Sequence, residues 1–391
     1  MLLDKEFPPD IRVEHEITAL SGANHEVVLA CCTREQHPWS DGWQDALVYR
    51  KKISAFRQKT AVGCLKFPLY FDFWRPYVRK LQAQYRFGAV HVHDLPLARM
   101  GAEMQDTFGI PLVLDLHENW PALLDVSPHV RGPLGRLLSS PDQWRRYEQE
   151  MVAAAAAVIV VVEENRQRLA QFTEYPAKLY LVSNTPVIEE LGDLSSLSQP
   201  RPRSMRIFYG GGIQEMRGLQ DVIRALAQLV EAPIELHVVG SGKYLHKLQA
   251  LAERQGVAPR VEFYGRQPLQ ELLRLMRKSD LLLIPHLKAE FSDTTVPHKL
   301  FQYMSTDKPI LASNCVPVQR VLQETAAGTV YTAGDVAALA RELQSFYQRW
   351  QQGDAPETGA RKHVLARYNW DVDKQVLIAL YDQLHEQGRV S

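Results

Sequence analysis

Short apolar, β-branched runs alternate along the first half of the chain with longer stretches whose apolar residues recur every three to four positions. The runs have the length of buried parallel strands, and the longer stretches have the period of amphipathic helices. The expected strands are 26–31, 89–93, 112–116, 158–162 and 179–182, after a short one at 2–5, and expected helices include 11–21, 95–108 and 144–156. This repetition predicts an α/β domain with a parallel sheet.

The rhythm stops at residues 188–204, a stretch rich in serine and proline that has the composition of a linker. A second series of strands follows, expected at 206–209, 234–239, 261–264, 281–285, 310–313 and 329–332. The predicted fold class is α/β, with two doubly wound Rossmann-like domains, 1–187 and 205–369, facing a cleft. Because open α/β sheets bind ligands beyond the carboxyl ends of their strands, the cleft is the expected active site.

The composition narrows the choice of partners and compartment. Of the 391 residues, 45 are Lys or Arg and 45 are Asp or Glu, which argues against nucleic acid as a partner. The four scattered cysteines are expected to be buried thiols in a reducing compartment, which predicts a cytoplasmic protein. They are Cys31, Cys32, Cys64 and Cys315. The opening residues lack a secretory signal, and the longest apolar run, 151–162, is too short to span a membrane and is expected to join a helix to a buried strand.

Motifs spread over nearly the whole chain point to one family. In order, they read PPDIRVEHEITAL, HVHD, LDLHENW, YGGGIQEMRGLQDVIRAL, VVGSG, VEFYG and PHKLFQYM. Together they resemble family 4 glycosyltransferases of the GT-B architecture. The resemblance implies retaining transfer of a sugar from a nucleotide diphosphate sugar to a saccharide or lipid-linked acceptor, without a required metal or other cofactor. It also implies that the first domain is the acceptor side and that a last helix, 370–388, packs back onto it.

Such a transfer needs fixed positive groups beside the diphosphate. Arg217 follows the glycine-rich turn that contains Gly211 and Gly212, and it is expected to open a helix there. The resemblance implies two charges near this turn, and since Gly212 takes the place of one, Lys299 is expected to supply the second. Gly240 is expected to let the donor approach the backbone. The alternative is that both cations are ordinary surface groups.

The segment before and after Lys299 alters the acidic positions of the family. Gln302 stands where the family carries a glutamate that binds ribose, and Thr294 stands eight positions earlier, where a second glutamate is usual. The amide oxygen of Gln302 can still accept a hydrogen bond, with a loss of about 1 kcal/mol for the missing charge. Thr294 and Thr295 are expected to donate to phosphate or sugar, or alternatively to cap the following helix.

The acceptor-side candidates lie in the first domain. His117 ends a strand and matches the family histidine that contacts the donor sugar, although a structural role is the alternative. Glu118 is expected to orient the acceptor or to cap the next segment. Asp10 and Arg12 follow the first strand, where the resemblance implies contact with donor phosphates and acceptor.

Two further histidines, His91 and His93, alternate on the preceding strand. They are expected to be structural and to face opposite sides of the sheet. Because no cysteine or acidic cluster lies near them in the sequence, no metal site is predicted.

Three hypotheses stay open beside the leading one. The aromatic and basic stretch 65–88 suits peripheral membrane contact if the acceptor is lipid-linked, but an amphipathic helix packed on the sheet is the simpler alternative. Loss of the family glutamates at Gln302 and Thr294 raises the alternative of a noncatalytic partner with a decayed donor site. A sugar-nucleotide epimerase needs acid and base carboxylates that the sequence does not place. Donor base, sugar, acceptor and linkage are not specified by the sequence.

Overall fold

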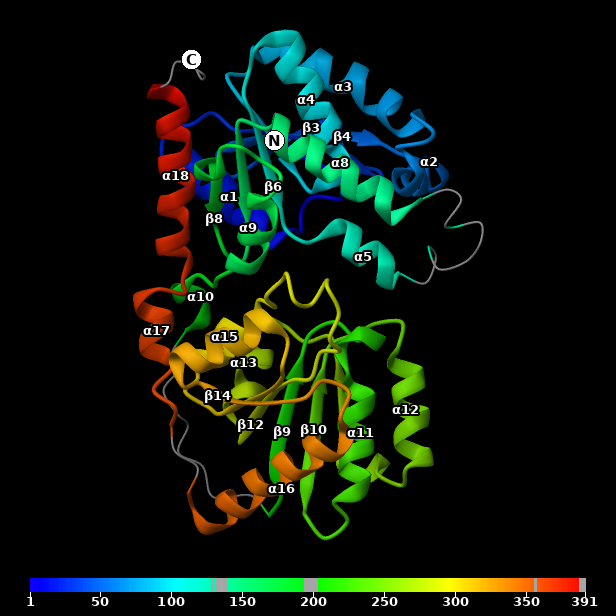
Figure 1. The fold of residues 1–391 in the computed structure, drawn as a ribbon, viewed down its shortest axis with the longest axis vertical. Coiled ribbons are helices and arrows are strands. Elements are labelled where there is room, and N and C mark those ends of the chain that lie inside the picture. Colours follow the sequence, from blue (N-terminus) through cyan, green and yellow to red (C-terminus); the bar gives the residue numbers. More distant parts are fainter. Residues whose placement is uncertain (128–129, 131–134, 136–138, 193–202, 355–356, 387–391) are drawn as a thin grey trace. The chain divides into compact units, whose positions relative to one another are not determined.

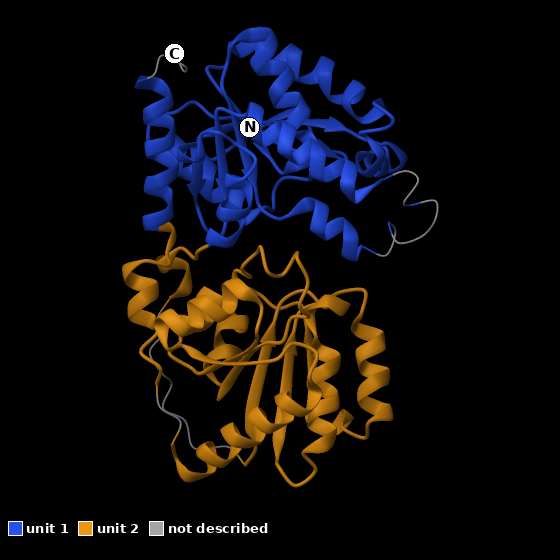
Figure 2. Ribbon diagram, viewed as in Figure 1, with its two compact units in different colours: residues 1–184, 371–391 blue, residues 185–370 orange. Residues whose placement is uncertain are grey.

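The structure is a computed structural model that describes residues 1–391 except 128–129, 131–134, 136–138, 193–202, 355–356 and 387–391. Two compact units divide the chain (Figure 2). Unit 1 comprises Met1–Asn184 and Asp371–Ser391, and unit 2 comprises Thr185–Trp370. Most of the predicted linker, 193–202, lies outside the described residues.

Unit 1 is built on an eight-stranded sheet in the order β3-β4-β2-β1-β5-β6-β7-β8. Its strands are β1 (Leu2–Leu3), β2 (Val28–Thr33), β3 (Ser40–Trp43), β4 (Ala46–Lys52), β5 (Val90–His93), β6 (Leu112–Leu116), β7 (Ala157–Val160) and β8 (Leu179–Leu181). All neighbours pair in parallel except β3 and β4. The predicted parallel sheet is therefore confirmed, with an antiparallel edge that the sequence pattern did not reveal.

The two strands that sequence reasoning missed form a hairpin at the edge of the sheet. Three of the four residues of β3 are exposed, and the sequence SDGW has no apolar run, so the pattern of a buried strand is absent. The opening strand β1 is as short as expected. It lies between β2 and β5 with both leucines buried, because parallel pairing on each side places it at the centre of the sheet.

Helices cover this sheet and bury their apolar faces against it (Figure 1). They are α1 (Ile11–Gly22), α2 (Ala55–Lys59), α3 (Leu69–Tyr85), α4 (Ala98–Phe108), α5 (Trp120–Val126), α8 (Pro141–Ala154), α9 (Glu163–Ala170) and α18 (Trp370–Glu386), with 3₁₀ turns at Thr60–Gly63, Leu95–Leu97 and Pro176–Lys178. The apolar run at 151–162 joins the end of α8 to β7, as predicted. Helix α18 belongs to unit 1 and buries Leu377, Leu380 and Tyr381.

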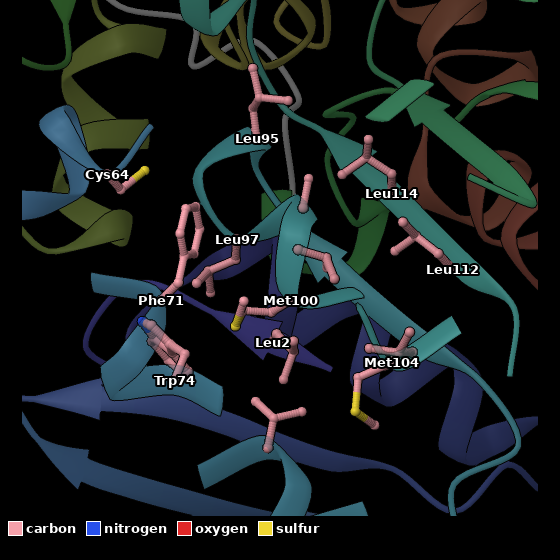
Figure 3. Packing of buried hydrophobic residues seen from close by; sticks show 14 of the residues in the cluster. Leu2, Cys64, Phe71, Trp74, Leu95, Leu97, Met100, Met104, Leu112 and Leu114 are labelled. Atoms are coloured by element: carbon pink, nitrogen blue, oxygen red, sulfur yellow. The ribbon is translucent and has the colours of Figure 1, made fainter. Parts of the chain in front are cut away.

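The aromatic residues of α3 belong to the core of unit 1. Phe71 and Trp74 are fully buried and pack near Met100 and Leu2 (Figure 3). Their burial confirms the amphipathic-helix interpretation of the stretch 65–88. The buried rings of α3 cannot form a membrane surface, whereas Phe67, just before the helix, is exposed.

Unit 2 is built on a six-stranded parallel sheet in the order β11-β10-β9-β12-β13-β14. Its strands are β9 (Met205–Gly210), β10 (Ile234–Val239), β11 (Val261–Gly265), β12 (Leu281–Ile284), β13 (Ile310–Ser313) and β14 (Gly328–Tyr331). Its helices are α10 (Ile188–Leu191), α11 (Leu219–Gln228), α12 (Leu245–Arg254), α13 (Leu269–Arg277), α14 (Lys299–Met304), α15 (Val316–Thr325), α16 (Val336–Gln352) and α17 (Arg361–Ala366), with 3₁₀ turns at Glu215–Arg217 and Ala258–Arg260. Two Rossmann-like domains confirm the predicted fold class. No described helix is long and apolar enough to cross a membrane.

Candidate active site

In unit 2, the turn after β9 packs against the turn after β10. Gly211 has φ +133° and Gly240 has φ +143°, conformations that favour glycine. A Cβ on Gly240 would lie 1.9 Å from the carbonyl oxygen of Gly211, and a Cβ on Gly211 would lie 2.9 Å from Nζ of Lys299. Both glycines are therefore required for the backbone and the lysine to approach each other. The carbonyl of the exposed Gly212 accepts a 2.8 Å hydrogen bond from the hydroxyl of Tyr209.

Lys299 lies in the first turn of α14, as predicted, and its side chain turns inward to the ring of Tyr209. Nζ lies 3.7 Å from the ring centroid, within cation–π range. Although the residue as a whole is partly exposed, Nζ is buried and has no hydrogen-bond partner among the described residues. Burial, followed by the charge of Arg217, holds the pKa of Lys299 well below its usual range. Nζ of Lys299 is thus a buried amine that has no carboxylate partner among the described residues.

Arg217 does not open a helix, which corrects the prediction. It ends the 3₁₀ turn Glu215–Arg217, and α11 begins only after Gly218, whose φ of +71° breaks the run. Nη1 of Arg217 lies 3.3 Å from Nε2 of His286, which must be the acceptor because guanidinium has none. Burial, then Arg217 and Lys299, hold the pKa of His286 well below its usual range, so the imidazole is neutral and able to accept.

The consequence is a concentration of positive charge without compensation. Neither Arg217 nor Lys299 lies within ion-pair distance of a carboxylate in the part of unit 2 that the structure describes. Because buried charges are normally paired, this arrangement could accept an anion. The glycine turns give that anion access to the backbone. A diphosphate has the charge and the acceptor oxygens that suit these cations and backbone groups.

The remaining donor candidates lie on or just before α14. Gln302 is half-buried and three positions after Lys299, so both side chains share one face of the helix. The hydroxyls of Thr294 and Thr295 point elsewhere. Thr294 donates to the carbonyl of Glu290 at 2.7 Å, and Thr295 donates to the carbonyl of Phe291 at 3.1 Å. The two hydroxyl groups therefore make hydrogen bonds within their own loop. Neither threonine caps α14, which has no side-chain cap.

In unit 1, His117 is held by a buried carboxylate that sequence reasoning missed. Nε2 of His117 lies 2.7 Å from Oδ2 of Asp115, two residues earlier at the end of β6, and Nδ1 lies 3.7 Å from Asp94. Burial alone would lower the pKa of His117, but Asp115 and then Asp94 outweigh it and raise the pKa to about 9. The imidazole is therefore cationic and fixed in orientation, with its side chain 13% exposed.

Arg12 is part of the same network rather than a free cation. Its guanidinium makes four hydrogen bonds, to both oxygens of Asp115, to the carbonyl of Val182 and to Oδ1 of Asn184. It also lies 3.0 Å from Glu16. The geometry does not support the predicted contact of Arg12 with donor phosphates, because these bonds occupy its donors. Its role in the structure is to compensate buried carboxylates.

Two other acceptor-side candidates have local structural partners. Asp10 caps α1, where its side chain accepts from the backbone N–H of Val13 at 3.3 Å. Glu118 is half-buried and close enough to Lys5 to raise the pKa of that lysine, together with the stronger effect of Asp94. The cap of the next helix, α5, is Asn119 and not Glu118, which corrects one of the two roles predicted for Glu118.

His91 and His93 face the same side of the sheet, so the prediction of opposite faces is wrong. Residues two apart on a strand share a face, and the two rings stack with centroids 4.5 Å apart. Both are buried beside Glu16 and Asp115. Sequence distance hid this cluster, since its members come from α1, β5 and β6.

Three partners of the candidate residues escaped sequence reasoning, namely Asp115 in unit 1 and Tyr209 and His286 in unit 2. Tyr209 and Asp115 lie inside apolar strand runs, where a core role is the ordinary expectation. Their one sequence signal is position, because each lies at or next to the last residue of a parallel strand, and His286 follows β12 by two positions.

Comparisons with known proteins identify the family of the chain. Residues 9–185 match the family model described as "Glycosyl transferase 4-like domain", and residues 198–363 match the one described as "Glycosyl transferases group 1". The chain is 25% identical over 210 residues to D-inositol 3-phosphate glycosyltransferase of Corynebacterium urealyticum. That match covers 51% of this chain and 48% of the relative, so it spans about half of the length of each.

Solved structures share the fold over nearly the full length. Sucrose-phosphate synthase from Thermosynechococcus elongatus superposes with a TM-score of 0.76 at 16% identity, over 98% of this chain and 95% of the other. Anabaena HepE in complex with UDP superposes with a TM-score of 0.71 at 16% identity, over 98% and 99% of the two chains. At 16% sequence identity, these matches show a shared fold.

Proposed function

The chain belongs to the glycosyltransferases of the 4-like and group 1 families, a two-domain class of GT-B fold. From this premise we propose that it moves a sugar from a nucleotide diphosphate sugar to a saccharide or lipid-linked acceptor. The observation that carries the proposal is the uncompensated pair Arg217 and Lys299 beside the turn at Gly211. The family places a nucleotide-sugar donor on this domain, and an uncompensated cationic pair is the chemical counterpart of a diphosphate.

The two cations stabilise the charge that grows on the leaving diphosphate. As the bond between the anomeric carbon and the phosphate oxygen breaks, negative charge collects on the diphosphate. Donors that are already in place lower the barrier without reorganisation. Neutral His286 keeps Arg217 in position, and the ring of Tyr209 holds Lys299 until the diphosphate replaces it as the partner of the ammonium group.

The other residues take supporting roles in the proposal. Gln302 accepts from a ribose hydroxyl, and cationic His117 of unit 1 contacts the transferred sugar. In retaining transfer, the acceptor oxygen bonds the anomeric carbon on the face that the diphosphate leaves, and its proton passes to the leaving phosphate oxygen. This course requires no carboxylate base, which is consistent with Gln302 and Thr294 at the glutamate positions of the family. It requires no metal ion.

The compartment and any membrane contact are also part of the proposal. The four cysteines are free and buried, which fits the reducing cytoplasm. Three large apolar side chains, Phe56, Phe67 and Leu69, are 76%, 53% and 51% exposed, and the exposed basic residues Arg57 and Lys59 lie beside them in sequence. Apolar and basic groups together suit a lipid surface, so this segment replaces the buried α3 rings as the candidate for membrane contact if the acceptor is lipid-linked.

A nucleotide screen tests the proposal. Thermal shift is measured with UDP, GDP, ADP and the corresponding nucleotide sugars, starting from UDP because HepE is known with that ligand. We expect one nucleotide to raise the melting temperature and its sugar conjugate to release nucleotide during incubation with acceptors. Arg217→Ala should abolish both effects.

Arg224→Ala is the matched control. Arg224 lies on α11 in the same unit, 48% exposed and paired with Asp221, so its loss should leave nucleotide binding unchanged. If no nucleotide shifts the melting temperature, the proposal fails. Binding without nucleotide release across a panel of saccharide and lipid-linked acceptors would instead favour the noncatalytic alternative.

A further inference from the structure

The core of unit 1 contains a cluster of two imidazoles and two carboxylates, of which the proposed transfer uses only Asp115, as the partner of His117. Its members are Glu16 on α1, His91 and His93 on β5, and Asp115 on β6. One ligand atom of each lies within 4.8 Å of those of the other three, and none of the four residues is more than 2% exposed. We refer to these four residues as the His–carboxylate cluster.

The distances inside the cluster suit a shared ion better than direct hydrogen bonds. Nε2 of His91 lies 3.5 Å from Oε2 of Glu16 and 3.8 Å from Oδ2 of Asp115. Nδ1 of His93 lies 3.9 Å and 3.4 Å from the same two oxygens. Hydrogen bonds between nitrogen and oxygen are shorter, at about 2.7–3.2 Å. Ligands about 2.1 Å from a tetrahedral ion lie about 3.4 Å apart, so small adjustments would complete the geometry.

Buried polar atoms of the cluster lack partners. Neither Nε2 of His91 nor Oε2 of Glu16 has a hydrogen-bond partner among the described residues, and the two atoms lie 3.5 Å apart within the cluster. Buried polar groups in folded proteins are nearly always hydrogen-bonded, and an exception indicates a water or an ion between them. These two atoms are an observation separate from the composition of the cluster.

The surroundings resemble the outer shell of a metal site. Nδ1 of His91 bonds the hydroxyl of Tyr381 on α18 at 2.9 Å, which leaves Nε2 for the ion, and metal-bound histidines commonly use their second nitrogen in this way. Arg12 holds the outer oxygens, Oε1 of Glu16 at 3.0 Å and Oδ1 of Asp115 at 2.9 Å. Oδ2 of Asp115 also accepts hydrogen bonds from Arg12 and His117, so the ion and these two donors would share that oxygen.

We propose that Glu16, His91, His93 and Asp115 bind one divalent transition-metal ion of the zinc class. Imidazole ligands favour zinc and its neighbours over magnesium or calcium, which take oxygen ligands and water. The protein fills all four positions, so the ion is structural and joins α1 to β5 and β6. This inference does not rest on the proposed sugar transfer, which takes place without the ion.

Metal analysis of the full chain tests the site. Protein without an affinity tag is loaded with zinc, desalted and measured by plasma mass spectrometry. We expect about one zinc per chain, a lower melting temperature after chelation, and recovery of that temperature on addition of zinc. Cobalt loading of the wild-type chain should give the visible absorption of a tetrahedral site without thiolate ligands.

Substitutions identify the ligands. Glu16→Gln and His93→Gln keep the side-chain size and should each weaken zinc binding at least about tenfold, whereas His246→Gln on the exposed face of α12 should retain the full stoichiometry. If the substitutions unfold unit 1, the wild-type cobalt spectrum and the chelation shift still decide. Absence of metal after loading, or zinc that is lost with His246→Gln and kept with the other two, would overturn the proposal, and the cluster would then hold only water.

Discussion

Replacing Lys299 with methionine should make the protein more stable and less able to bind its nucleotide. Methionine keeps the length of the side chain and can pack its sulfur against the ring of Tyr209. The buried amine without a hydrogen-bond partner costs about 1–3 kcal/mol, and Lys299→Met removes that cost. For a unit of this size, each kcal/mol corresponds to about 2–4 °C in melting temperature.

The same substitution should weaken binding, because the ammonium lies beside Gly211, at the turn that is proposed to receive the diphosphate. A hydrogen bond to a charged group contributes about 1.5–3 kcal/mol, so the dissociation constant for UDP, or for whichever nucleotide the screen selects, should rise about 10–150-fold. Calorimetric titration measures this constant, and differential scanning calorimetry without ligand measures the stability.

Lys247→Met is the matched control for both measurements. Lys247 also lies over a tyrosine ring, 5.5 Å from the centroid of Tyr244, but it is exposed on α12. It should change neither the melting temperature nor the affinity appreciably. If Lys299→Met lowers the melting temperature and leaves nucleotide affinity unchanged, Lys299 is a structural residue and the diphosphate assignment is wrong.

Three further predictions concern pH, the ribose contact and the buried network. Burial and Arg217 hold the pKa of Lys299 low, and a diphosphate would raise it, so nucleotide binding should take up a proton between the two pKa values and affinity should fall as pH rises. Calorimetry over a series of pH values, in buffers of different ionisation heat, detects this uptake, and its absence at every pH would count against the contact. Gln302→Glu should tighten nucleotide binding about fivefold, for about 1 kcal/mol of charge assistance to a ribose hydroxyl, and weaker binding in titrations would exclude that contact. Asp115→Asn should lower the free energy of unfolding by about 3–5 kcal/mol in urea denaturation, because Arg12 and His117 lose their buried counterion, and a change below about 1 kcal/mol would refute the network.

Much of the fold was available from local patterns in the chain. The strands Ile234–Val239 and Ile310–Ser313 were predicted to the residue, because each is a short, largely apolar run bounded by loops. The hairpin Ser40–Trp43 and Ala46–Lys52 was missed for the converse reason. β3 lies at the edge of the sheet with three of its four residues exposed, and β4 ends in the basic run Arg50, Lys51 and Lys52, so neither strand is apolar throughout.

For the candidate site, the residues themselves could be predicted from local sequence features, whereas their surroundings could not. Arg217 and Lys299 were predicted from the glycine turn and the helix start, which are local features. Their true surroundings were not, because the ring of Tyr209 and the imidazole of His286 meet them only when β9, β12 and α14 come together. For Arg12 the motif suggested a phosphate contact, whereas the fold directs its guanidinium to Asp115, about a hundred residues away in the sequence.

The sequence by itself determined the class of fold and the family, since periodicity, glycine turns and ordered motifs depend on neighbouring residues. Tertiary structure alone decided which charges are compensated. It paired Arg12 and His117 with Asp115, and it left Lys299 without a counterion. It also gathered Glu16 with the two histidines that the sequence had set aside. The physical reason is that burial and electrostatic interaction depend on distance in space, which a parallel sheet sets by bringing the ends of separate strands together.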